Sequence, residues 1–185
     1  MTREETLRFI EVIKPFDEKE AAHLQDALNW VAGNEPLYRI QKPDVPPKHL
    51  VSYFVIVDPV SHKMLLQDHL LAKRWIPAGG HVDPNEDPAE TVRRECMEEL
   101  GIEATFLHDD PQFITVTVTN GQGEHTDVSL WYVLQAGETT PLVIEPGSFA
   151  DVKWWDIDEI LATPIEKFDP ELHRFIAKTR QSLVY

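Results

Sequence analysis

Residues 80–102 read Gly80-His81-Val82-Asp83-Pro84-Asn85-Glu86-Asp87-Pro88-Ala89-Glu90-Thr91-Val92-Arg93-Arg94-Glu95-Cys96-Met97-Glu98-Glu99-Leu100-Gly101-Ile102, and this stretch decides the fold. Asp87 can cap the amino end of a helix, and Pro88 suits the first helical position. Gly101 can end the helix in a left-handed conformation. Between these residues, apolar side chains recur at spacings of three and four as Ala89, Val92, Cys96 and Leu100. The stretch therefore predicts a glycine turn followed by an amphipathic helix.

The same helix carries three glutamates beside its apolar stripe. At roughly 100° per residue, Glu95, Glu98 and Glu99 occupy one arc of about 100°. Like charges at this spacing repel each other by a few tenths of a kcal/mol per pair, unless a cation joins them. Mg²⁺ prefers oxygen ligands and often bridges carboxylates to phosphates. For Glu98-Glu99 alone, a solvated acidic face is the better interpretation. The glycine turn, Arg94 and the two helix stops at fixed spacing favour a metal site.

The stretch resembles the Nudix box, G-x5-E-x7-R-E-U-x-E-E-x-G-U with U aliphatic, at every fixed position. The one departure is Cys96, which stands where an aliphatic residue is usual. Cysteine behaves as a small hydrophobe, so we expect this departure to alter packing and not chemistry. The wider resemblance to Nudix hydrolases runs from about His49 to about Ile160. It implies an α/β fold, a Nudix-type α/β/α sandwich with a mixed β-sheet, to which this chain adds an N-terminal helical extension.

The resemblance also implies roles for the residues of the box. Glu95, Glu98 and Glu99 share the metal-ligand and general-base roles. We expect Glu99 and Glu95 to be ligands, and Glu98 to be a ligand or the base. The implied ion is Mg²⁺, with Mn²⁺ as a possible substitute. The backbone carbonyl of Gly79 is expected as a further ligand, because a glycine pair lets the backbone approach an ion. Arg94 and Glu86 resemble the pair that braces the loop against the helix.

Many Nudix hydrolases use a further carboxylate from outside the box. Glu145 is the first candidate for that role, followed by Glu124, Asp127 and Asp151, although each of them is also a plausible surface residue. Other side chains have two readings. His81 and His125 could touch a substrate or simply lie in loops, and Trp131, Trp154 and Trp155 could stack on a base or fill the core. Cys96 lies on the apolar stripe, which counts against an isomerase of the isopentenyl diphosphate type that relies on a cysteine.

The composition restricts the partners and the compartment. The net charge of −15 argues against binding to a nucleic acid backbone. A phosphate site would then need bound Mg²⁺ and local cations to reverse the field, the candidates being Lys73, Arg74, Arg93 and Arg39. No segment is apolar and long enough to span a membrane, no signal peptide is evident, and the single cysteine excludes an intramolecular disulfide. These features predict a cytoplasmic protein.

Two regions are expected along the chain: a helical N-terminal extension with a Pro-rich linker over residues 1–46, and the Nudix domain with a C-terminal helix over residues 47–185. Periodicity and stop signals predict helices over 2–13 and 18–32, strands over 50–57, 63–68, 75–82, 112–119, 127–134 and 152–155, a helical turn over 158–161, and a helix after 169–170. The extension is more acidic than basic, so packing on the core or a dimer contact is expected in place of DNA binding.

Together these features predict a Mg²⁺-dependent hydrolase that cleaves a diphosphate bond in a nucleoside diphosphate linked to another moiety, by water attack on phosphorus. The leading substrates are nucleoside triphosphates, oxidised ones included. ADP-ribose or nucleotide-sugar pyrophosphatase activity is the first alternative, and a non-catalytic, nucleotide-binding regulatory module is the second. The expected partners are a small phosphoanhydride substrate and possibly a second copy of the chain, with neither nucleic acid nor membrane. The intact set of box glutamates favours an enzyme.

Overall fold

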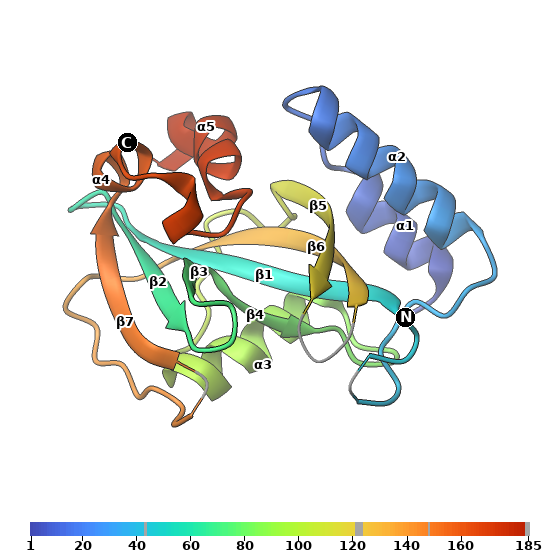
Figure 1. The fold of residues 1–185 in the computed structure, drawn as a ribbon, viewed down its shortest axis with the longest axis horizontal. Coiled ribbons are helices and arrows are strands. Elements are labelled where there is room, and N and C mark those ends of the chain that lie inside the picture. The colour runs from blue at the N-terminus through green and yellow to red at the C-terminus, as the bar shows by residue number, and fades with distance from the viewer. Residues whose placement is uncertain (43, 121–123, 148, 184–185) are drawn as a thin grey trace. The chain divides into compact units, whose positions relative to one another are not determined.

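The computed structural model describes residues 1–42, 44–120, 124–147 and 149–183. The described residues form five α-helices, one 3-10 helix and seven strands (Figure 1). In chain order these are α1 (Arg3–Glu11), α2 (Glu18–Ala32), β1 (Lys48–Asp58), β2 (Lys63–His69), β3 (Arg74–Ile76), β4 (Ala78–His81), α3 (Pro88–Leu100), β5 (Phe113–Asn120), β6 (Glu124–Gln135), β7 (Phe149–Asp156), α4 (Ile157–Ala162), η1 (Ile165–Lys167) and α5 (Leu172–Leu183). Pro43, in the predicted linker, lies outside the described residues. None of the helices in the described ranges combines the length and the apolar character needed to cross a bilayer.

The hydrogen-bonded neighbours of the sheet follow the order β3-β2-β1-β6-β5, while β4 pairs with β1 and β7 pairs with β2. Strands are present in every region where alternation and turn signals predict one, with ends that differ by up to three residues. The single strand predicted over 75–82 is instead two strands, β3 and β4. Both β6 and β7 begin three residues earlier than predicted, β6 at Glu124 and not at Asp127. His125 is therefore a strand residue, and it lies on the same face of β6 as Asp127 because side chains alternate along a strand.

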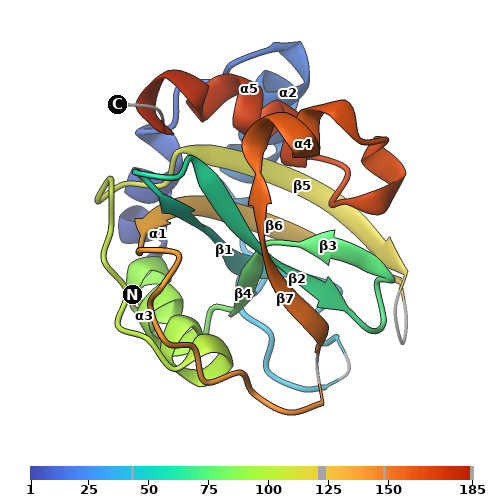
Figure 2. The same ribbon diagram turned by 90° about the vertical axis from the view of Figure 1, so that its left-hand side faces the viewer.

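The chain divides into two compact units. The first comprises Met1–Tyr53, Gly79–Val92 and His108–Tyr132, and the second comprises Phe54–Ala78, Arg93–Leu107 and Val133–Tyr185. In the first unit, β5 and β6 pair antiparallel from Phe113↔Trp131 to Asn120↔Glu124. In the second unit, β2 pairs antiparallel with β7 from Lys63↔Asp156 to His69↔Phe149, so these two strands run side by side (Figure 2).

The N-terminal helices begin and end close to where the sequence predicts. The Thr2 hydroxyl caps α1 by accepting from the Glu5 amide, and the Glu5 carboxylate accepts from the Thr2 amide. Asp17 caps α2 by accepting from the Glu20 amide at 2.8 Å. The two helices lie side by side, and α2 contacts β5 within the same unit (Figure 1). The expectation that the extension packs on the core is confirmed.

Glu20 ties α2 to the sheet. Its side chain is fully buried, and its carboxylate accepts from the backbone amide of Phe16 at 2.6 Å and from that of Ile114 on β5 at 3.3 Å. Both amides would lose this partner if the carboxylate were removed, and a buried polar group without a partner costs about 1–3 kcal/mol.

Glu20→Ala is therefore expected to lower the free energy of unfolding by about 1–3 kcal/mol, measured by urea denaturation. The amides of Phe16 and Ile114 should exchange their hydrogens faster in this variant than in the wild type. Glu18→Ala is the matched control, since Glu18 lies in the first turn of the same helix but is exposed. Equal stabilities for the two variants would contradict a tethering role for Glu20.

The residues that start α3 fix it to β1 and to the preceding loop. The Ser52 hydroxyl on β1 donates to the Pro88 carbonyl at 2.9 Å, and both residues are buried. Asp87 caps the helix by accepting from the Ala89 amide at 2.8 Å. At the other end, Gly101 has φ +68°, and a Cβ there would lie 2.6 Å from the Val143 Cβ. Both predicted helix stops are confirmed.

Candidate functional site

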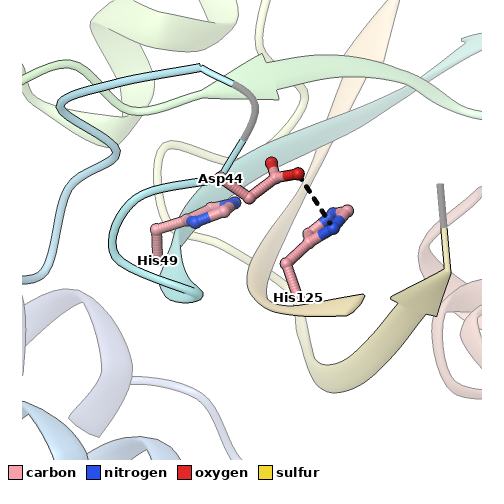
Figure 3. A group of neighbouring side chains, drawn as sticks. All are labelled: Asp44, His49 and His125. Carbon is pink, nitrogen blue, oxygen red and sulfur yellow. Dashed lines mark ion pairs between the residues drawn. The ribbon is translucent and has the colours of Figure 1, made fainter. Parts of the chain in front are cut away.

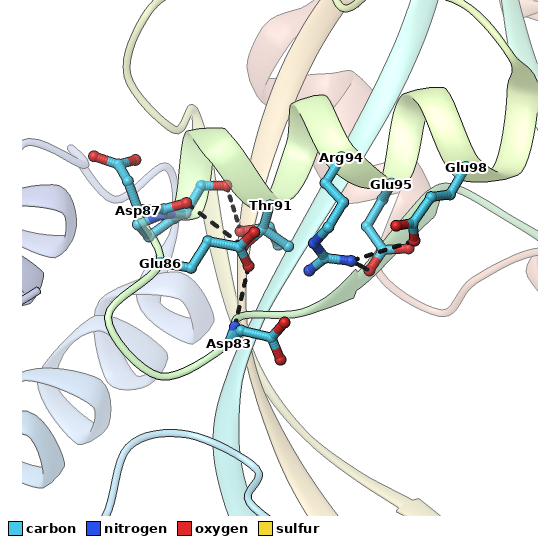
Figure 4. Close-up of polar contacts among 9 residues, drawn as sticks. Asp83, Glu86, Asp87, Thr91, Arg94, Glu95 and Glu98 are labelled. Atoms are coloured by element: carbon cyan, nitrogen blue, oxygen red, sulfur yellow. Dashed lines mark hydrogen bonds and ion pairs between the residues drawn. The ribbon is translucent and has the colours of Figure 1, made fainter.

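The three box glutamates differ in exposure and in partners. Arg94 Nη1 lies 2.5 Å from Glu95 Oε1 and 3.4 Å from Glu98 Oε2, so one guanidinium contacts both carboxylates (Figure 4). The Glu95 side chain is 15% exposed, whereas the Glu98 side chain is 55% exposed and remains open to solvent. The helix therefore brings the carboxylates of Glu95 and Glu98 to the same guanidinium, that of Arg94.

Glu99 has a different environment. Its Oε2 accepts from Gln67 Nε2 on β2 at 3.3 Å. It also acts on Cys96: burial, and then the Glu99 charge, raises the pKa of the Cys96 thiol to about 12. Cys96 is fully buried, so it packs as an apolar side chain and is not a thiolate at neutral pH. This agrees with the expectation that Cys96 is no nucleophile.

The donor set of α3 suits a hard divalent cation. Glu95, Glu98 and Glu99 supply carboxylate oxygens on neighbouring turns of one helix, which are the ligands Mg²⁺ prefers. The Arg94 guanidinium at Glu95 and Glu98 shows that these carboxylates already converge on positive charge. The oxygen chemistry of these residues thus suits the ion that the sequence predicts, while their role as its ligands stays a prediction.

Glu86 braces the loop that leads into α3. Its Oε2 accepts from the Asp83 amide at 3.1 Å and from the Thr91 hydroxyl at 2.7 Å (Figure 4). These bonds join the loop to the first turn of the helix, which is the bracing role expected of Glu86. Arg94 was expected to share that role, and its hydrogen bonds described above go to Glu95 and Glu98.

Gly79 occupies a position that no other residue fits. Its φ is +151°, and a Cβ there would lie 2.3 Å from the Ser52 carbonyl oxygen and 2.6 Å from Tyr53 Cδ1. Glycine thus allows β4 to lie close against the β1 backbone. The ligand role of the Gly79 carbonyl stays a prediction.

Among the candidate carboxylates outside the box, Glu145 lies near a box glutamate. Its backbone amide donates to the Glu99 carbonyl at 3.0 Å, and its side chain is exposed. Glu124 and Asp151 are exposed at the start of β6 and near the start of β7. Asp127 is buried, and its carboxylate contacts histidines of its own unit. The role of Asp127 as a further ligand of the ion at the box glutamates stays a prediction, as does that of Glu145.

Sequence reasoning missed a group of imidazoles and carboxylates in the first unit. His49 on β1, His81 at the end of β4 and Asp127 on β6 offer ligand atoms within 4.8 Å of one another, and so do Asp44, His49 and His125. The pair His125 and Asp127, two apart on a strand, was the available signal, because such residues share a face. The sequence does not reveal the partners from β1 and β4, which depend on strand pairing.

The tryptophans and cations are placed as follows. Trp131 is fully buried and Trp155 is only 2% exposed, so both belong to the core. Trp154 is half-buried. The guanidinium of Arg93 lies 4.6 Å from the centre of the Phe106 ring. Arg39 Nη1 lies 3.8 Å from Asp44 Oδ1. A phosphate-binding role for Arg39, Arg93, Lys73 or Arg74 stays a prediction.

The sequence of this chain is similar to proteins of a known family. The family described as NUDIX domain matches residues 48–178. An RNA pyrophosphohydrolase of Bartonella henselae is 31% identical over 111 residues, which cover 51% of this chain and 63% of that protein. An asymmetrical bis(5'-nucleosyl)-tetraphosphatase of Rattus norvegicus is 50% identical over 44 residues, covering 24% of this chain and 30% of that protein. The chain thus spans less than two thirds of the length of either relative.

Solved structures agree on the fold. The crystal structure of a MutT NUDIX hydrolase from Burkholderia pseudomallei superposes with a TM-score of 0.54 and 24% identity, over 71% of this chain and 97% of that one. This likeness, together with the sheet and helices described above, confirms the expected Nudix-type α/β fold with a mixed sheet and additional N-terminal helices.

Proposed function

Because this chain belongs to the Nudix family, we propose that it is a Mg²⁺-dependent hydrolase that cleaves a diphosphate bond in a nucleoside diphosphate linked to another moiety. The observation that carries the proposal is the arrangement of α3. Its carboxylates Glu95 and Glu98 both contact the Arg94 guanidinium. Glu99 lies on the same helix and accepts a hydrogen bond from Gln67. Such oxygen-rich sites serve phosphoryl chemistry.

The reaction needs charge neutralisation and a deprotonated water. A divalent ion held by the carboxylates of α3 would supply Lewis acidity to the phosphate oxygens and ease the deprotonation of the attacking water. Glu95 and Glu99 are the proposed ligands, and Gly79 and Glu145 are further candidates. Glu98, the most exposed of the three glutamates, is proposed to hold a second ligand position or to accept the proton of the attacking water. Arg94 holds Glu95 and Glu98 in place, and Glu86 holds the loop.

The leading substrates are nucleoside triphosphates, oxidised ones included. The names of the two relatives support only the broader class of substrates with a phosphoanhydride bond next to a nucleoside, since one is a pyrophosphohydrolase of RNA and the other a tetraphosphatase of bis-nucleosyl compounds. ADP-ribose or a nucleotide sugar is the alternative substrate class. A non-catalytic nucleotide-binding module is the alternative outside the enzymes, and the intact set of Glu95, Glu98 and Glu99 counts against it.

A phosphate-release screen with the full chain tests these proposals. It covers nucleoside triphosphates, nucleotide sugars, dinucleoside polyphosphates, ADP-ribose and 5'-triphosphate RNA, with Mg²⁺ or Mn²⁺, with and without coupled pyrophosphatase. One substrate class should turn over, and both EDTA and Glu99→Gln should abolish this turnover. If a nucleotide raises the melting temperature while none of these substrates is hydrolysed, the regulatory module replaces the enzyme.

Three further predictions from the sequence accompany this proposal. The division into an extension (residues 1–46) and a Nudix domain (residues 47–185) is supported by the family match, which starts at residue 48. A homodimer is tested by light scattering of the full chain during size exclusion, where a monomer mass would contradict it. A cytoplasmic location stays the expectation from the sequence.

A further inference from the structure

Three strands of the first unit bring together histidines and a carboxylate, of which His49 and Asp127 are buried and His81 and His125 partly buried. His49 belongs to β1, His81 ends β4, and His125 and Asp127 lie near the start of β6. Within the described residues, the ligand atoms of His49, His81 and Asp127 lie within 4.8 Å of one another. The ring centres of His49 and His81 are 4.7 Å apart. None of these residues belongs to the carboxylate set of α3.

Hydrogen bonding determines which nitrogen of His49 faces the group. Its Nδ1 lies 2.9 Å from the Pro46 carbonyl oxygen. A carbonyl only accepts, so Nδ1 carries the hydrogen, and Nε2 is the nitrogen that faces the group and can serve as a ligand when it holds no proton. That Nε2 lies 3.1 Å from Asp127 Oδ1. Metal-binding histidines commonly donate their other N–H to a backbone carbonyl in this way.

The second ligand position, Asp127, is oriented by its neighbours. Its Oδ2 accepts from the Thr119 hydroxyl at 3.1 Å, which leaves Oδ1 turned toward His49. The residue is only 7% exposed, so its carboxyl group lies inside the group of ligand atoms and not at the surface.

His81 lies in the same surroundings. One of its ring nitrogens lies within 4.8 Å of the ligand atoms of His49 and Asp127. An imidazole–carboxylate pair alone would explain His49 and Asp127, because an ion pair between them also brings Nε2 and Oδ1 together. It leaves the convergence of His81 on the same spot without an explanation.

We propose that His49, His81 and Asp127 bind a divalent transition-metal ion of the zinc class. Imidazole nitrogens select such ions, whereas Mg²⁺ prefers oxygen. Zinc binds nitrogen and carboxylate oxygen at about 2.0–2.2 Å, so two tetrahedral ligands lie about 3.3–3.6 Å apart. The 3.1 Å between His49 Nε2 and Asp127 Oδ1 is slightly shorter, so a small shift of either side chain brings both atoms to the ligand separation. The ion joins β1, β4 and β6 independently of the Mg²⁺ site.

His125 and Asp44 form the outer part of this group. His125 Nδ1 lies 3.4 Å from Asp44 Oδ2 (Figure 3). Its Nε2 lies 3.5 Å from Asp127 Oδ2. The His125 ring also stacks on His49, with ring centres 5.5 Å apart. His125 therefore positions the ligands Asp127 and His49 from one side. Such supporting partners alter metal affinity by about 10–100-fold when they are removed.

The test is Zn²⁺ binding to the metal-free full chain in excess Mg²⁺, measured by competition with a chromophoric chelator. The wild type should bind one equivalent and melt at a higher temperature with Zn²⁺. His49→Ala and Asp127→Asn should each weaken binding by at least about 100-fold, and His125→Ala by about 10–100-fold. Co²⁺ should give visible d–d bands in the wild type that both ligand variants lack. Asp127→Asn keeps the shape of the side chain, so its loss of binding does not depend on misfolding.

Two controls separate this site from other causes. His23→Ala removes a histidine of α2 outside the group and should leave Zn²⁺ binding unchanged. Glu99→Gln should also bind Zn²⁺ normally, because the box contributes no ligand to this site. The proposal is overturned if the wild type fails to bind Zn²⁺ in excess Mg²⁺, or if His49→Ala binds it equally well. Destabilisation by His49→Ala without Zn²⁺ binding by the wild type would identify an ion pair between His49 and Asp127.

Discussion

Glu98→Gln is expected to lower kcat by about 10²–10⁴-fold at saturating Mg²⁺ and substrate, the range for loss of a positioned proton acceptor. Glutamine keeps the size of the side chain and cannot accept the proton of the attacking water. The melting temperature should change little, since the Glu98 side chain is 55% exposed and its pairing with Arg94 is a surface interaction. Activity on the substrate found in the phosphate-release screen, together with thermal unfolding, measures both effects.

The metal dependence of this variant distinguishes the two roles proposed for Glu98. If Glu98 is a ligand, a higher Mg²⁺ or Mn²⁺ concentration should restore part of the rate. If it is the base, excess metal should not restore the rate. Glu90→Gln is the matched control, because Glu90 is exposed on the first turn of α3 and outside the carboxylate arc. Equal activity of Glu98→Gln and Glu90→Gln would exclude Glu98 from catalysis.

Local signals account for the elements that sequence reasoning predicted well. Asp17 and Asp87 cap helices through hydrogen bonds to residues two or three positions ahead, and Gly101 takes a left-handed conformation at the end of α3. These interactions lie within one turn, so residue type and spacing suffice to predict them. The same holds for the arc of box glutamates, which is a property of helical geometry alone.

Contacts between segments distant in the sequence were not predictable in this way. Gln67 reaches Glu99 from 32 positions earlier, and Glu20 accepts from an amide 94 positions later. The convergence of His49, His81 and Asp127 likewise depends on which strands pair and in which register. Register follows from the burial of whole strand faces, so a polar residue on a strand does not reveal its neighbours on the next strand.

Trp131 shows how burial decides between two readings that the sequence left open. Its side chain is fully buried, with the Tyr53 and Phe113 rings edge-on at 5.4 and 5.7 Å between centres. Its indole N–H donates to the Thr115 hydroxyl at 3.1 Å. An indole enclosed in this way and already hydrogen-bonded packs the core of its unit and has no free face for a nucleotide base.

Trp131→Ala is therefore expected to lower the free energy of unfolding by about 3–5 kcal/mol, because it opens a large cavity and leaves Thr115 without its donor. Trp131→Phe should cost less, since a smaller ring refills part of the space, and it should leave KM unchanged. Urea denaturation followed by circular dichroism measures the stabilities, with Trp154→Ala as the matched control at a half-buried tryptophan. A raised KM in Trp131→Phe with wild-type stability would show instead that the indole contacts the substrate. The enclosed indole and its Thr115 bond argue for the loss of stability, because an aromatic ring that binds a ligand must keep one face accessible.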